Sequence, residues 1–177
     1  MIYVIRHGKT EGGQKGEVPL NEHGIQQSKE IAPKVAKLGI NHIFSSDVKR
    51  AMQTTEIINE VTKLGVTYDS RLREFSILTN YPLKSLDNLT QQEIEKYGEG
   101  IKESFKDAYN RVNDFLNDLR KNKIDNVAIV THRGVISTIS YCLNNGEFDF
   151  ERFDKNRKAY KQGTDNCSIT VFELYDA

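Results

Sequence analysis

The chain has 177 residues, in which 25 Lys and Arg balance 25 Asp and Glu. This length suits a single domain over residues 1–177, large enough to bury about 70% of its unfolded surface without disulfides or bound metal. Balanced charge excludes a global basic field, so we expect no nucleic-acid and no membrane partner, and any anion site must be local. No apolar run approaches about 18 residues and no signal-peptide pattern opens the chain, which predicts a soluble, cytoplasmic protein.

The N-terminal part of the chain alternates between strand and helix patterns. Short stretches of mainly β-branched and aromatic residues predict strands over residues 2–5, 42–45 and 66–69. Between the first two, helical spacing of apolar residues predicts a helix over 24–38, which Pro33 should bend or split. After the second strand, Ser46 or Asp47 should cap a helix that stops at Gly65.

The C-terminal part begins with a polar, turn-rich stretch over residues 76–100 that holds one expected helix, over 91–97. Apolar residues at steps of three and four from Ile101 to Leu119 then predict the clearest helix of the chain, which faces the core. The remaining predicted elements are a buried strand over 126–131, a helix over 134–143 and an alternating strand over 167–174.

This order predicts an α/β fold of three layers, with a mostly parallel sheet between helices and a small helical cap inserted at about 76–125. In such sheets, ligands bind beyond the carboxyl ends of the strands. Three strand ends bring polar residues to that edge: Arg6-His7-Gly8, Ser45-Ser46-Asp47 with Arg50, and Thr131-His132-Arg133-Gly134. We therefore expect two histidines and three arginines to gather there.

Such a cluster suits a dianionic phosphate. Guanidinium groups bind phosphate oxygens in pairs, and an imidazole can attack phosphorus. Glycines at positions 8 and 134 would let backbone N–H groups approach the same anion, at a helix N-terminus in the second case. The pattern predicts a site for phosphate ester chemistry.

Ordered motifs that run almost from end to end carry a family resemblance. They are Arg6-His7-Gly8 with Thr10-Glu11, the stretch from Leu20 to Gln27, the stretch from Ser45 to Thr54, Leu72-Arg73-Glu74, Glu103-Ser104, Thr131-His132, and the stretch from Asn166 to Thr170. Together they resemble the histidine phosphatase superfamily, also called phosphoglycerate mutase-like. The resemblance implies that His7 is the nucleophile that becomes phosphorylated. It also implies that Arg6, Arg50 and His132 hold the phosphoryl oxygens and that Glu74 donates a proton to the leaving group.

The resemblance extends to further site residues and has three departures. We expect His132 to be catalytic as well as phosphate-binding, and Gly8 to help bind phosphate. Substrate contacts are expected from Thr10, Gly13, Arg133 and Gly134. Gly13 stands where many members have a phosphate-binding Asn, and Arg133 stands where many have Gly, either as an added anion ligand or as a solvent-facing replacement. The Trp-Glu-Gly that often follows the acid is absent.

The implied activity is that of a metal-independent phosphohydrolase that needs no cofactor. Arginines would stabilise the charge on the transferring oxygens, and a phosphohistidine would divide the hydrolysis into two steps. A small phosphorylated metabolite is the expected substrate, with a phosphoprotein as the alternative, and the sequence indicates no oligomeric state. A phosphoglycerate-type mutase is the nearest alternative activity, although the resembling mutases are longer. A non-catalytic member that binds a phosphorylated ligand is another.

Two unrelated functions could also use some of these residues. A metal hydrolase could use His7, His132, Asp47 and Glu74, yet three arginines in the same pocket would repel a divalent cation. A nucleotide-binding module could use Gly12-Gly13-Gln14-Lys15-Gly16, but that stretch lacks the Gly-Lys-Ser/Thr ending of a phosphate-binding loop. The sequence favours neither.

Overall fold

The structure is a computed structural model that describes residues 1–11, 17–75, 103–160 and 164–175. Its elements, in chain order, are β1 (Ile2–Arg6), α1 (Glu22–Ala36), β2 (His42–Ser45), α2 (Lys49–Thr62), β3 (Gly65–Tyr68), the 3-10 helix η1 (Ser70–Leu72), α4 (Phe105–Lys121), β4 (Val127–Thr131), α5 (Arg133–Asn145), α6 (Phe150–Tyr160) and β5 (Ile169–Phe172). The expected helix over 91–97 lies outside the described residues.

The strands form one sheet in the order β3-β2-β4-β1-β5. All neighbouring pairs are parallel except β1 and β5, which run antiparallel. The mostly parallel α/β fold is therefore confirmed. In the register of the sheet, Arg6 of β1 lies opposite Thr131 of β4, and Ser45 of β2 lies opposite Val130. This register brings the carboxyl ends of three strands to one edge.

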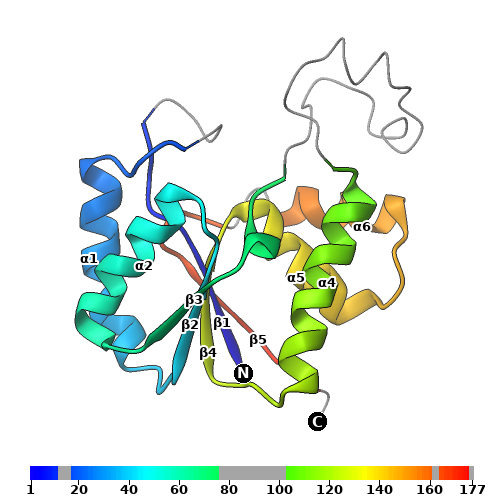
Figure 1. The fold of residues 1–177 in the computed structure, drawn as a ribbon. Coiled ribbons are helices and arrows are strands. Elements are labelled where there is room, and N and C mark those ends of the chain that lie inside the picture. The colour runs from blue at the N-terminus through cyan, green and yellow to red at the C-terminus, as the bar shows by residue number, and fades with distance from the viewer. Residues whose placement is uncertain (12–16, 76–102, 161–163, 176–177) are drawn as a thin grey trace.

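Helices cover both faces of the sheet, as Figure 1 shows: α1 and α2 lie on one side, and α4, α5 and α6 lie on the other. The largest core cluster lies on the side of α4, whose buried apolar residues are Phe105, Ala108, Tyr109, Val112, Phe115, Leu116 and Leu119. Burial of each large side chain contributes about 1.5–3 kcal/mol. Residues 105–121 of the expected cap thus belong to the helical layer of the core, and residues 76–102 are outside the described part.

Helix α1 is not split at Pro33, and β5 has a direction that the sequence pattern left open. Helix α1 is continuous through Pro33, because Ile31, Ala32 and Val35 are buried on the face that packs against α2. That packing outweighs the lost backbone hydrogen bond. The final strand pairs antiparallel with β1. The alternation of apolar residues predicts a strand there but not its direction.

The ends of α2 also differ. The helix begins after Val48, whose own side chain cannot cap it, and the backbone N–H of Lys49 in the first turn donates to Oε2 of Glu17 at 3.0 Å. Neither Ser46 nor Asp47, the expected caps, is the N-cap residue. The Ser46 hydroxyl lies 2.9 Å from Nε2 of His132 and accepts from the backbone N–H of Val48 at 3.4 Å, and Asp47 pairs with Arg73. The helix ends before Lys63, which adopts the left-handed conformation at φ 55°, rather than running to the glycine at position 65.

Helix α6 was not expected from the sequence. Its aromatic side chain Phe153 is fully buried in the core. On the same helix, Asp154 forms ion pairs with Arg157 and Lys158. Phe150 and Tyr160 also pack against the core but are only partly buried, and the periodic signal of the helix is too weak for sequence-based detection. None of the helices in the described part is long and apolar enough to cross a membrane.

Candidate active site

His7 follows β1 and is almost fully buried, with 1% of its surface exposed. Its Nδ1 lies 2.7 Å from the carbonyl oxygen of Gly8. A carbonyl can only accept, so Nδ1 carries the proton and the neutral ring keeps its lone pair on Nε2. Arg50 donates from Nε to that Nε2 at 3.3 Å. Nε2 is therefore the ring atom available for nucleophilic attack.

The surroundings of His7 keep its ring neutral. Burial and the positive charges of Arg50, Arg6 and Arg133 lower the pKa of His7 from 6.5 to about 3, against the opposing pull of the Gly8 carbonyl. At neutral pH the imidazole holds a single ring proton. It needs no base to remove a second proton before it attacks phosphorus.

Backbone contacts hold the residue after β1 in place. The backbone N–H of His7 donates to Thr131 of β4 at 2.9 Å, and the side-chain amide of Asn166 donates to the His7 carbonyl at 2.8 Å. The Gly8 N–H donates to Thr54 Oγ1, so it is engaged within the protein. A side chain at Gly8 would collide with the carbonyl of Gly24 in α1, 2.6 Å away. In this structure Gly8 thus serves close packing.

Two buried arginines flank His7. Arg6 is 4% exposed and donates from Nη1 to the Thr164 carbonyl at 2.6 Å, while its Nε is buried without a partner. Burial and the charge of Arg133 lower the pKa of Arg6 to about 10. Arg50, in the first turn of α2, is 2% exposed, and burial lowers its pKa. A guanidinium with a pKa of 10 stays charged at neutral pH.

His132 lies at the end of β4 and completes the group of buried cation and imidazole side chains. Its ring centroid is 5.1 Å from that of His7, and its Nε2 is 2.9 Å from the Ser46 hydroxyl. Burial, then the proximity of His7 and Arg50, lowers its pKa well below the ordinary value. Its Nδ1 is buried without a partner, so the ring has unused hydrogen-bonding capacity at the site.

Glu74 approaches the cluster from the segment after η1. Glu74 as a whole is partly exposed, but its carboxyl group accepts two backbone hydrogen bonds. The N–H of Gly134 donates to Oε2 at 3.3 Å, and the N–H of Phe75 donates to Oε1 at 3.0 Å. Burial raises the pKa of Glu74, while Arg50 and Arg111 oppose that rise. In its ionised form Glu74 acts on Arg6 and Arg50, so its carboxyl group lies near these two buried arginines.

The four expected substrate contacts have different positions. Thr10 forms an isolated β-bridge with Leu20 in the loop after β1. Gly13 lies outside the described residues. Arg133 is the first residue of α5 and is partly buried. Gly134 donates its backbone N–H to Glu74, so it meets the expected acid within the protein.

Three residues that sequence reasoning did not assign to the site support it. Ser46 contacts His132, Asn166 holds the His7 carbonyl, and the Thr164 carbonyl accepts from Arg6. The position of Ser46 at a strand end is a signal that could have identified it. Asn166 and Thr164 are more than 150 positions away from His7 and Arg6 in the chain, so no local pattern links them to the site. In the described ranges, no three His, Cys, Asp or Glu side chains gather so as to hold a metal ion.

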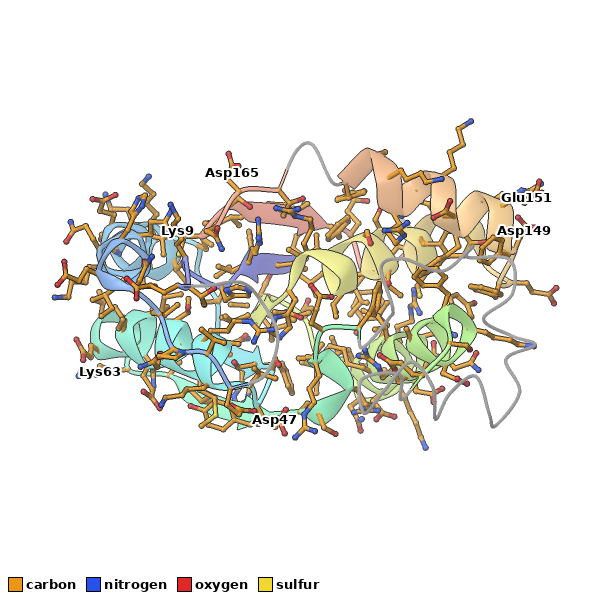
Figure 2. The ribbon with its side chains drawn as sticks, turned by 90° about the horizontal axis from the view of Figure 1, so that it is seen from above. Lys9, Asp47, Lys63, Asp149, Glu151 and Asp165 are labelled. Atoms are coloured by element: carbon orange, nitrogen blue, oxygen red, sulfur yellow. The ribbon has the colours of Figure 1, made fainter. Side chains whose placement is uncertain are left out.

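Figure 2 looks down on the molecule from the top of Figure 1, with Asp47 and Asp165 on opposite sides of the strand ends. Asp47 follows β2 and Asp165 precedes β5, in agreement with the sheet order.

The fold and the cluster define an α/β protein with buried histidines and arginines at the carboxyl edge of its sheet. The model of the histidine phosphatase superfamily (branch 1) matches residues 2–177. The chain belongs to this superfamily, as its motifs indicated.

The chain is 35% identical over 98 residues to a protein of Escherichia coli described as probable phosphoglycerate mutase GpmB. That match covers 52% of this chain and 45% of the relative, so it spans about half the length of each. A mycobacterial glucosyl-3-phosphoglycerate phosphatase, solved with VO3, is similar in structure at a TM-score of 0.68 and 24% identity, over 95% of this chain and 88% of that one. The alpha-ribazole phosphatase of Shigella flexneri is similar at a TM-score of 0.65 and 22% identity, over 87% and 83%. These structural likenesses confirm the fold.

Proposed function

We propose that this protein is a metal-independent phosphohydrolase that cleaves phosphate monoesters through a phosphohistidine on Nε2 of His7. The observation that carries the proposal is the state of His7: a buried, neutral imidazole with Nδ1 bonded to the Gly8 carbonyl and Nε2 facing Arg50. Membership in the histidine phosphatase superfamily supports the reaction class. We further propose a small phosphorylated metabolite as substrate and a cytoplasmic location.

In the first step, the phosphoryl group of the ester lies among Arg6, Arg50 and His132. The Nε2 lone pair attacks phosphorus, an N–P bond forms and the P–O bond to the leaving group breaks. Glu74, whose carboxyl holds its proton more tightly than usual, gives that proton to the departing oxygen. The guanidinium groups stabilise negative charge on the transferring oxygens without reorganising.

In the second step, water takes the place of the departed alcohol. Glu74, now a carboxylate, accepts a proton from the water as its oxygen attacks phosphorus, and the N–P bond breaks. The step releases inorganic phosphate, returns the neutral imidazole of His7 and leaves Glu74 protonated. Each group therefore ends the cycle in the state in which it began.

A phosphomutase is the second candidate, and the 35% identity to a probable phosphoglycerate mutase favours it. Both activities share the first step and differ in the acceptor, which is water in one case and a second hydroxyl group in the other. Incubation of the phosphorylated protein with phosphoglycerates decides between them. Release of inorganic phosphate supports the hydrolase, and interconversion of the 2- and 3-phosphates without release supports the mutase.

The test of the proposed function is replacement of the nucleophile. His7→Ala should abolish turnover of a panel of phosphate monoesters, while His23→Ala, at an exposed position of α1, should retain it. Wild-type protein quenched during turnover should carry an acid-labile, base-stable phosphoramidate that His7→Ala lacks. A folded His7→Ala protein with a near-normal rate would refute the covalent mechanism. Absence of any turnover by the wild type would favour a member that only binds a phosphorylated ligand.

A further inference from the structure

Arg133 is a partly buried cation next to the two histidines of the site. It opens α5 directly after His132, its side chain is partly buried, and its Nε is buried with no hydrogen-bond partner. Among the residues that the structure describes, it takes part in no ion pair. Its charge acts on both Arg6 and His7, which puts the guanidinium near the phosphate-binding group.

Other arginines around the site each donate at least one hydrogen bond within the protein, although the Nε of Arg6 is also buried without a partner. The partners are the Thr164 carbonyl for Arg6, His7 for Arg50, Asp47 for Arg73, and Glu103 with the Arg71 carbonyl for Arg111. Arg133 stands apart from this pattern. A partly buried cation without a counter-charge is unfavourable, and binding of an anion removes that cost.

Charge at the site leaves room for such an anion. Arg6, Arg50 and Arg133 contribute three positive charges, and the phosphoryl group of a monoester dianion contributes two negative ones. Glu74, as proton donor, is neutral when the substrate binds. The carboxylates of Asp165 and Glu17 also act, on Arg6 and on Arg50 respectively, but both residues are exposed and their charges are therefore screened by water. One positive charge remains without a counterpart.

We propose that Arg133 binds an anionic group of the substrate that is not transferred to His7. The preferred substrates are then phosphate monoesters that carry a second anion, a carboxylate or another phosphate, close to the ester. This inference rests on the proposed function, because it takes His7 as the acceptor of the transferred group. Arg133 is a specificity-determining residue in this scheme, and its planar guanidinium suits bidentate contact with either kind of anion.

The kinetic test compares matched substrates. The first pair is 3-phosphoglycerate and glycerol 3-phosphate, and the second pair is fructose 1,6-bisphosphate and fructose 1-phosphate. In each pair, the wild type should have the higher kcat/KM for the substrate that carries the second anionic group. Arg133→Gln should lower that selectivity ratio by about 10- to 100-fold, the usual effect of losing a charge-assisted hydrogen bond. Arg133→Lys should retain part of it. Arg152→Gln, at an exposed position of α6, is the matched control and should leave the ratio unchanged.

The two pairs also show which anion Arg133 binds. A carboxylate site raises the ratio of kcat/KM values in the first pair, and a phosphate site raises that ratio in the second pair. An equal loss on all four substrates would overturn the proposal and make Arg133 a ligand of the transferred phosphoryl group. If Arg133→Gln leaves the selectivity ratio unchanged, the proposal is also overturned, and Arg133 is a solvent-facing side chain.

A binding experiment keeps this inference separate from the proposed function. Calorimetry with 3-phosphonopropionate and with propylphosphonate, which cannot be hydrolysed, measures the contribution of the second anion without turnover. The wild type should bind 3-phosphonopropionate about 10- to 100-fold more tightly than propylphosphonate, and Arg133→Gln should remove most of that difference. Equal affinities in the wild type would refute the role of Arg133 even if the enzyme is an active phosphatase. A preference without turnover would uphold that role while refuting the hydrolase.

Discussion

The backbone N–H of Gly134 donates to Oε2 of Glu74 at 3.3 Å, so the first turn of α5 holds the carboxyl group of the proposed acid. A Cβ atom at Gly134 would lie less than 3.0 Å from Oε1 of Glu74 and 2.7 Å from Cε2 of Phe75. Glycine is therefore required here for the close approach of the acid to the helix.

Gly134→Ala should displace Glu74 and Phe75 from this position. We expect kcat for alkyl phosphates to fall at least about 10-fold, because a misplaced acid protonates the leaving oxygen poorly. A nitrophenyl phosphate needs that proton less and should lose less activity. Steady-state kinetics on both esters measure the difference. The same loss on both would show that the substitution disturbs the site in general.

Glu74→Gln removes the proton itself. Single-turnover phosphorylation of His7 by alkyl phosphates should fall by about 10²–10⁴-fold, with a much smaller loss for nitrophenyl phosphate. The pKa of Glu74 is raised, and the protonated form is active, so the wild-type rate should fall as pH rises through that pKa. The variant should lack this basic limb.

The control for this experiment is Glu60→Gln at an exposed position of α2, which should behave as the wild type. If Glu74→Gln slows both ester types equally, Glu74 only positions or shields the site. The acid would then have to be sought among Glu11, Asp47 and Glu103.

The neutral, buried state of His7 should appear in the pH dependence of stability. The pKa of His7 is about 3 in the folded protein and about 6.5 when unfolded, so the unfolded chain binds the extra proton first. The contribution of His7 to stability is full above pH 6.5 and is lost as pH falls toward 3. Between pH 7 and 5 the free energy of unfolding should drop by about 2 kcal/mol on account of His7.

Denaturant titrations of wild type and His7→Gln in phosphate-free buffer at the two pH values measure this contribution. The decline with falling pH should be smaller in His7→Gln by about that amount, whereas His23→Gln should follow the wild type. Parallel declines in all three proteins would show that the His7 ring is not held neutral. His132, whose pKa is also lowered, should add a loss of the same sign.

Metal removal should leave the hydrolase active. In the proposed mechanism, Arg6 and Arg50 would supply the positive charge that a divalent cation provides in metal-dependent phosphatases. We expect an unchanged rate after exhaustive chelation, and inhibition by vanadate, which mimics five-coordinate phosphorus. An assay with and without chelator checks the first expectation. Activity that disappears with chelator and returns with one divalent ion would favour the metal hydrolase.

The amino-acid sequence by itself determined which strand ends carry the site. β1 and β4 are short and mainly apolar, and a histidine follows the last residue of each strand. In a parallel sheet such strand ends must share an edge. The convergence of Arg6, His7, Arg50 and His132 therefore followed from the order of elements. Local propensity was enough for this inference, because each strand and the polar residues after it are adjacent in the chain.

Tertiary structure alone decided the states and partners of those side chains. The tautomer and low pKa of His7 depend on burial and on Arg50, 43 positions away, and its carbonyl is held by Asn166, 159 positions away. Val48 rather than Ser46 is the N-cap residue of α2, and the Ser46 hydroxyl contacts His132, 86 positions away. Pro33 lies within a continuous helix, because long-range packing outweighs local preference there. Desolvation and hydrogen bonding between distant segments are set by the packed fold, which local sequence patterns do not encode.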